Sequence, residues 1–133
     1  MSFQCVVVTP EQQALDESAE QVILPAWDGQ VGILSGRAPL LVKLGLGVLR
    51  VDTAGGRSRS FMIDGGIGQM KDNRLTILTN EAVAAEDIDA ESARAQYAEA
   101  EARVANDAKT REDRTHQLRR ARVQQELAAG RKA

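Results

Sequence analysis

The amino-acid composition of this chain changes sharply near Asp87. Residues 1–86 contain ten of the eleven glycines and all three prolines, and these residues separate short apolar runs. Residues 87–133 contain no proline and one glycine, Gly130, within long stretches of Ala, Glu, Gln and Arg. Short apolar runs punctuated by Gly and Pro are typical of strands, whereas Ala- and charge-rich stretches are typical of helices. The sequence therefore predicts an all-β domain at 1–86 and a helical domain at 87–133.

The first domain contains seven segments with the apolar and β-branched composition of strands. They lie at residues 3–9, 21–24, 31–34, 40–44, 48–51, 59–63 and 75–79. The glycines at 45–47 predict a break between the fourth and fifth segments, and those at 65–66 end the sixth. Residues 53–56 and 71–74 have the Gly, Asn and Asp content of hairpin turns. Many short strands joined by turns predict a β-sandwich or a barrel.

The second domain has the pattern of two helices. Residues 87–89 offer an N-cap, and the first helix has one small-residue stripe: Ala90, Ala93, Tyr97, Ala100 and Val104. Asn106 and Asp107 weaken this helix, and Thr110 with Asp113 resembles a capping box that opens a second one. The second helix has only a poor apolar stripe, formed by Leu118, Ala121 and Gln125, with Val123 and Leu127 beside it. A short break between two helices predicts an antiparallel hairpin.

Few large apolar side chains are available to stabilise this hairpin. Burial of an alanine methyl contributes about 0.8 kcal/mol, whereas a buried Leu or Val contributes about 1.5–3 kcal/mol. Ordering each residue costs about 1–2 kcal/mol of backbone entropy. The hairpin is therefore expected to be marginally stable and able to change conformation.

Charge is distributed unevenly along the chain. Residues 1–108 carry 9 basic and 16 acidic side chains, a net charge of −7, whereas residues 109–133 carry 8 basic and 3 acidic ones, a net charge of +5. A basic end on an acidic body favours an acidic partner surface.

No catalytic or metal-binding pattern is present in the sequence. His116 and Cys5 are the only histidine and cysteine, so no zinc site and no internal disulfide are expected. The glycines at 65–68 do not complete a dinucleotide-binding motif, and no phosphate-binding loop motif occurs. No secretory signal and no apolar stretch of 18 residues is found. We therefore expect a non-catalytic protein without a cofactor or direct membrane insertion.

Several short motifs occur in a recognisable order. Residues 29–34 read GQVGIL, 36–41 read GRAPLL, 47–51 read GVLRV, 65–67 read GGI, and 75–82 read LTILTNEA. In this order they resemble the epsilon subunit of F-type ATP synthases of the bacterial type. The family usually has Pro and His where this chain has Ser35 and Arg37.

The resemblance implies an N-terminal β-sandwich that anchors the subunit in the central rotor stalk, and a regulatory C-terminal helical hairpin. The implied partners of the sandwich are the gamma subunit and the ring of c subunits. The candidate contact residues lie in two turns: Asp28, Gly29, Gln30, and Gly36, Arg37, Ala38, Pro39. The implied location is peripheral, on the cytoplasmic face of the bacterial inner membrane.

The resemblance also implies that an extended hairpin inhibits ATP hydrolysis. Its basic residues would then meet an acidic segment of the beta subunit, with alpha as a further contact. The candidate residues for this contact are Arg111, Arg114, Arg119, Arg120 and Arg122.

Some family members bind ATP through the motif [IL]-D-x-x-R-A at the start of the first helix. Here Ile88, Asp89 and Ala93 match this motif, but Ser92 occupies the arginine position. We therefore expect weak or absent nucleotide binding. A free-standing module that binds nucleic acid or nucleotide is the alternative interpretation. The acidic β domain and the aromatic content of 3% are unfavourable for nucleic-acid binding.

Overall fold

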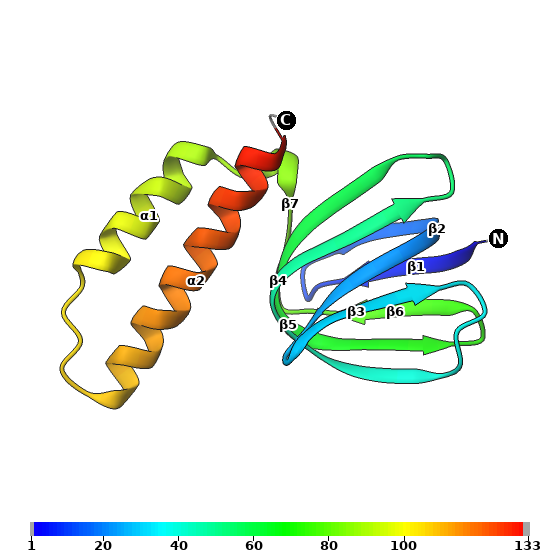
Figure 1. The fold of residues 1–133 in the computed structure, drawn as a ribbon, viewed down its shortest axis with the longest axis horizontal. Helices are drawn as coiled ribbons and strands as arrows, with labels where there is room; N and C mark the ends of the chain where they lie inside the picture. The colour runs from blue at the N-terminus through cyan, green and yellow to red at the C-terminus, as the bar shows by residue number, and fades with distance from the viewer. Residues whose placement is uncertain (1, 132–133) are drawn as a thin grey trace. The chain divides into compact units, whose positions relative to one another are not determined.

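The computed structural model describes residues 2–131, and the chain divides into two compact units between Ala84 and Ala85. The first unit is an all-β sandwich and the second is a helical hairpin, so the predicted fold class is confirmed (Figure 1). The strands of the first unit are β1 (Phe3–Val8), β2 (Gln13–Ala26), β3 (Gly29–Leu34), β4 (Leu40–Thr53), β5 (Ser58–Lys71), β6 (Arg74–Leu78) and β7 (Ala82–Ala84).

The strands follow the order β1-β6-β5-β4-β2-β3, and β7 pairs with β5. β1 is parallel to β6 and also pairs antiparallel with β2, so the sheet closes around a core. This core consists mainly of aliphatic side chains and includes Leu24, Ile33, Leu49, Ile63 and Ile77, together with Phe61. Aliphatic side chains thus fill a sandwich that has few aromatic residues.

The predicted break at residues 45–47 is wrong, because β4 continues through it from Leu40 to Thr53. The glycines instead allow close packing: a Cβ atom at Gly47 would lie 2.8 Å from Pro25 Cβ, and one at Gly45 would lie 3.1 Å from Trp27 Cα. β4 therefore passes close against the end of β2 without leaving the sheet.

The predicted end of a strand before Gly65 and Gly66 is also wrong. β5 continues from Ser58 to Lys71, and these two glycines have φ of 79° and 117° within it. Residues before them pair with β7, and residues after them pair with β6. The positive φ angles bend β5, so that one strand pairs with two different neighbours.

The other strands and turns largely follow the sequence pattern. Asp72 and Asn73 both have positive φ, 53° and 58°, as the predicted hairpin turn between β5 and β6 requires. β2 is longer than predicted, because its polar first half pairs with β1 while Leu15 and Ala19 are buried. β7 was not predicted.

The second unit comprises a short 3-10 helix, η1 (Ala85–Asp87), and two α-helices, α1 (Ala90–Ala102) and α2 (Ala108–Arg131). The predicted N-cap is confirmed, since Asp89 Oδ1 accepts a hydrogen bond from Glu91 N at 3.0 Å. α1 ends before Val104, which is 72% exposed and does not join the predicted stripe.

The predicted cap of the second helix lies three residues too late. α2 begins at Ala108, and Asp107 Oδ1 accepts hydrogen bonds from Thr110 N at 2.8 Å and from Thr110 Oγ1 at 2.7 Å. Asp107 therefore satisfies the N-terminal amides of α2, while Thr110 lies inside the helix as a donor.

Candidate functional site

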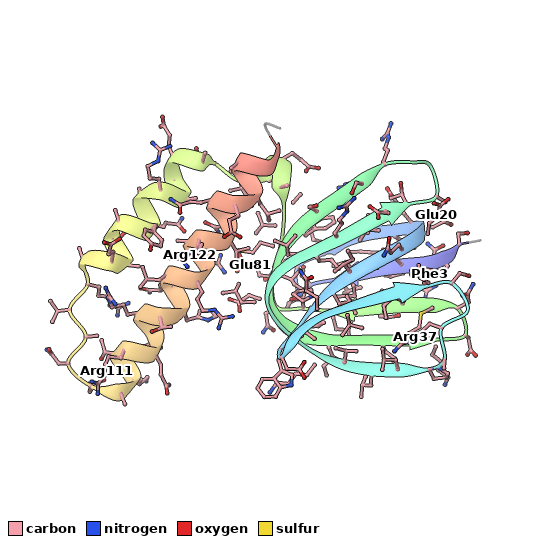
Figure 2. All side chains as sticks on the ribbon, viewed as in Figure 1. Phe3, Glu20, Arg37, Glu81, Arg111 and Arg122 are labelled. Atoms are coloured by element: carbon pink, nitrogen blue, oxygen red, sulfur yellow. The ribbon has the colours of Figure 1, made fainter. Side chains whose placement is uncertain are left out.

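The seven predicted contact residues of the sandwich are all exposed, but they form two separate groups. Asp28, Gly29 and Gln30 lie where β3 begins, whereas the loop containing Arg37 follows the end of β3. Figure 2 shows Arg37 on the side of the sandwich where Phe3 lies. Six extended residues span about 20 Å, so the structure places the two groups at opposite ends of one strand.

The loop that carries Arg37 is held by the turn between β5 and β6. Asn73 Oδ1 accepts hydrogen bonds from Gly36 N at 2.9 Å and from Ser35 Oγ at 3.3 Å. Asn73 Nδ2 also donates to the carbonyl oxygen of Ser2 at 3.0 Å. The Ser35 side chain thus adds a hydrogen bond that a proline at this position could not make.

The turn that carries Asp28 is held by β4. Trp27 N donates to the carbonyl oxygen of Lys43 at 3.0 Å, and the Lys43 ammonium lies 5.7 Å from the centroid of the Trp27 ring. The Trp27 side chain is nevertheless 70% exposed. An aromatic side chain that is exposed on a fixed backbone is typical of a binding hot spot.

Sequence reasoning missed a group of exposed apolar side chains on the outer face of β4, β5 and β6. Ile67 is the cross-strand partner of Leu78 and of Lys43, and Leu41 lies two residues before Lys43 on the same face. Leu41, Ile67 and Leu78 are 69%, 47% and 53% exposed, and we call them the apolar row. Neighbouring exposed apolar side chains often mark an interaction site.

The hairpin is lined mainly by small side chains. Among the described residues of α1 and α2, the buried apolar ones are Ala93, Ala100, Ala121, Ala128 and Leu127. This agrees with the expectation of few large apolar contacts. The stability of the packing between α1 and α2 therefore depends on polar contacts more than that of a typical helical core does.

Three arginines make those polar contacts. Arg103 Nη1 donates to Gln117 Oε1 at 2.8 Å, and Arg114 Nη2 donates to the carbonyl oxygen of Glu101 at 2.8 Å. The second bond satisfies a carbonyl in the last turn of α1, which has no partner within the helix.

The third contact joins Arg122 to Tyr97. Arg122 Nη2 donates to Tyr97 Oη at 3.3 Å, and the guanidinium carbon lies 5.9 Å from the ring centroid. The hydrogen bond to Tyr97 raises the pKa of Arg122 above its ordinary value. Figure 2 shows Arg122 at the middle of the hairpin and Arg111 near its closed end.

The five predicted inhibitory arginines therefore have different environments. Arg114 and Arg122 bind α1, and Arg120 lines a cavity of about 680 Å³ between the two helices. Arg111 and Arg119 are exposed on another face of α2, beside His116. In the folded hairpin, no single surface presents all five guanidinium groups.

The predicted nucleotide residues are arranged around the start of α1. Ile88 and Ala93 are 5% and 1% exposed, and Asp89 caps the helix through its side chain. Ser92 Oγ accepts a hydrogen bond from Gln96 Nε2 at 3.3 Å. The position at which the resemblance implies an arginine thus holds a short hydroxyl side chain.

Residues 2–131 contain no group of His, Cys, Asp and Glu side chains placed to hold a metal ion. No helix within this range is long and apolar enough to cross a membrane. Cys5 is fully buried, and burial together with nearby Glu17 and Asp16 raises the pKa of its thiol to about 12.

The fold is similar to those of solved ATP synthase subunits. A chain in the cryo-EM structure of the Euglena gracilis mitochondrial ATP synthase OSCP/F1/c-ring assembly superposes with a TM-score of 0.85 at 25% identity, covering 96% of this chain and 81% of that one. A chain of the Tetrahymena thermophila mitochondrial ATP synthase central stalk and c-ring has a TM-score of 0.67 at 15% identity, covering 92% and 93%. The second likeness concerns the fold alone.

Sequence comparison gives the same family. Residues 2–85 match the family described as "ATP synthase, Delta/Epsilon chain, beta-sandwich domain". The ATP synthase epsilon chain of Rhodopirellula baltica is 45% identical over 100 residues, covering 75% of this chain and 77% of the relative. That of Prochloron didemni is 34% identical over 135 residues, covering 98% of both. The chain therefore belongs to the family of ATP synthase epsilon chains, the family that the order of its short motifs predicted.

Proposed function

We propose that this chain is a non-catalytic rotor subunit of a proton- or sodium-translocating F-type ATP synthase. Its sandwich binds the gamma subunit and the c-ring, and its C-terminal helices inhibit ATP hydrolysis. Membership of the epsilon-chain family supports the role in the complex. The proposed location is peripheral, on the cytoplasmic face of the bacterial inner membrane.

The apolar row is the observation that carries the anchoring role. Leu41, Ile67 and Leu78 lie on adjacent strands of the sandwich and expose about half or more of their surface. Covering such a row releases water from apolar surface, which contributes about 25 cal/mol per Å². In this proposal gamma covers the row, and the turns around Asp28 and Arg37 contact gamma and the c-ring.

The regulatory role depends on the arginines of α2. In the folded hairpin, Arg114 and Arg122 donate to acceptors on α1. If the helices separate and extend along gamma, these two guanidinium groups lose their partners and become available to carboxylates of beta, with alpha as a further contact. Folding of the hairpin and binding to beta thus compete for the same donors.

A truncation after Glu86 tests the anchoring role. The remaining sandwich is expected to co-purify with gamma and to support coupled ATP synthesis, because it retains the apolar row and both turns. A matched variant, Ile67→Ser in the full chain, is expected to weaken the association with gamma. A folded truncation that fails to associate with gamma would refute this part of the proposal.

Replacement of Arg119, Arg120 and Arg122 by Ala tests the regulatory role. The variant is expected to hydrolyse ATP faster within the assembled enzyme, because the extended tail loses charge-assisted contacts with beta. Assembly should be unchanged, and Lys109→Ala serves as a control that removes one basic charge outside the predicted contact set. Unchanged hydrolysis in both the triple variant and the tail truncation would show that the hairpin is not inhibitory.

A further inference from the structure

β3 is an edge strand without the features that usually protect an edge. It is the last strand in the sheet order and pairs only with β2. Its sequence, GQVGIL, contains no charged residue and no proline. Exposed edges normally carry charges, prolines or bulges that prevent pairing with another chain. β3 is therefore able to accept a further strand.

Part of the β3 backbone points away from β2. The carbonyl oxygen of Leu34 accepts a hydrogen bond from Arg37 N at 3.3 Å, so it is directed away from the ladder. Because backbone direction alternates along a strand, the amides and carbonyls of Gly32 and Gln30 share this outward direction. A Cβ atom built at Gly32 would meet nothing within 4 Å, so no neighbouring group covers the outer face of β3 at this residue.

Both ends of β3 are fixed, and each carries one exposed charge. The hydrogen bond from Gly36 N to Asn73 Oδ1 holds the loop of Arg37, and the hydrogen bond from Trp27 N to the carbonyl oxygen of Lys43 holds the turn of Asp28. Within residues 2–131, the Asp28 and Arg37 side chains have no hydrogen-bond or ion-pair partner. The edge therefore presents a carboxylate at its start and a guanidinium at its end, with an uncharged strand between them.

We propose that β3 receives an extended segment of the gamma subunit as an added strand. This inference rests on the proposed function, since gamma is the partner proposed there. Main-chain hydrogen bonds to the outward groups of Gln30 and Gly32, and to the amide of Leu34, provide affinity. The two charges fix the register, because they select a segment with a basic residue near Asp28 and an acidic residue near Arg37.

Hydrogen exchange in the complex with gamma tests this proposal directly. In the isolated chain, the amides of Gln30, Gly32 and Leu34 are expected to exchange faster than those of Val31 and Ile33, which face β2. On binding gamma, the exchange of the first set should slow at least about tenfold. If gamma binds but these amides exchange as before, strand addition is refuted while the proposed anchoring stands. If gamma does not bind, both proposals fail.

A pair of substitutions at Gly32 distinguishes an added strand from a gamma subunit that only covers β3 without main-chain hydrogen bonds. Gly32→Pro removes an outward amide and is expected to weaken binding of gamma about tenfold, whereas Gly32→Ala retains the amide and should bind within about twofold of the original chain. Equal affinity of the two folded variants would overturn the proposal. If Gly32→Pro fails to fold because proline fixes φ at this position, the exchange measurement on the original chain decides on strand addition.

Reversal of the charges at Asp28 and Arg37 tests whether they fix the register of the added strand on β3. Asp28→Lys and Arg37→Glu are each expected to weaken binding severalfold, and the loss should shrink at high salt. Unchanged affinity of the doubly reversed chain would refute the contribution of these charges to the register.

Discussion

Gly66 is the position where a single methyl group should damage the sandwich most specifically. A Cβ atom at Gly66 would lie 2.1 Å from the carbonyl oxygen of Leu78 and 2.8 Å from Thr79 Cα, and φ is 117°. Both contacting atoms belong to the backbone, so no side chain can rotate away. The conformational strain is about 1–3 kcal/mol and the steric term about 1–3 kcal/mol. Gly66→Ala should therefore cost about 2–6 kcal/mol, a large fraction of the typical 5–15 kcal/mol for a domain.

Gly65→Ala is the matched control for this prediction. Its φ is 79°, but an added Cβ atom would meet nothing within 4 Å. The substitution should therefore carry only the left-handed backbone penalty of about 1–2 kcal/mol. The difference between the two variants in free energy of unfolding therefore measures the cost of the close contact between β5 and the end of β6.

Labelling of Cys5 in a urea series measures the loss of stability in both variants. Cys5 is the only cysteine and is fully buried in the sandwich, so its modification reports unfolding of this unit and is insensitive to the hairpin. Gly66→Ala should move the labelling midpoint to lower urea by at least about twice the shift of Gly65→Ala. It should also weaken gamma binding, because Ile67 and Leu78 pair beside Gly66. Equal midpoints for the two variants would refute the close-approach argument.

Three further predictions concern single groups. Without denaturant, iodoacetamide at pH 8 should leave Cys5 unmodified, because a pKa of about 12 leaves about one thiolate in ten thousand; rapid labelling would contradict this. Hydrogen bonds from Thr110 lower the pKa of Asp107, so its contribution to α2 is complete above about pH 4 and is lost as the pH falls further; circular dichroism of Asp107→Ala should show less helix at pH 7 and a smaller acid-induced loss. Ser92→Arg should raise ATP affinity in calorimetry, whereas tight ATP binding by the original chain would oppose the prediction.

Local chemistry was sufficient to predict several parts of the fold. Asp72 and Asn73 adopt positive φ in a turn because their side chains tolerate that conformation, and this preference is visible in the sequence. Asp89 caps α1 because a carboxylate there satisfies an amide that has no helical partner. These features depend on neighbouring residues only.

Features that depend on distant strands were not predictable. The glycines in β4 and β5 are read locally as breakers, but they permit close approach to Pro25, Trp27 and Leu78, which are distant in sequence. The apolar row was missed for the same reason, because Ile67 becomes a neighbour of Leu78 only through the pairing of β5 with β6. The register between strands decides which apolar side chains are exposed together.

The environments of the arginines of α2 were likewise not predictable from the sequence, because they depend on how the two helices pack. Their number predicted a basic helix, but the sequence did not show that Arg114 and Arg122 bind α1. Which arginines bind α1 follows from the register of the two helices, because this register places Tyr97 beside Arg122 and Glu101 beside Arg114. A long side chain with several donors fits both an internal and an external acceptor, so its choice depends on geometry.

The separation of the two turns by the length of β3 has a mechanical consequence. A domain attached to a shaft at one point can pivot about that point, because a single contact offers no lever arm. Attachment at both ends of a strand about 20 Å long opposes such pivoting, since any tilt must stretch one contact while compressing the other. If gamma binds the turns of Asp28 and Arg37 at opposite ends of β3, as proposed above, the sandwich is suited to transmit torque with little rotation relative to gamma.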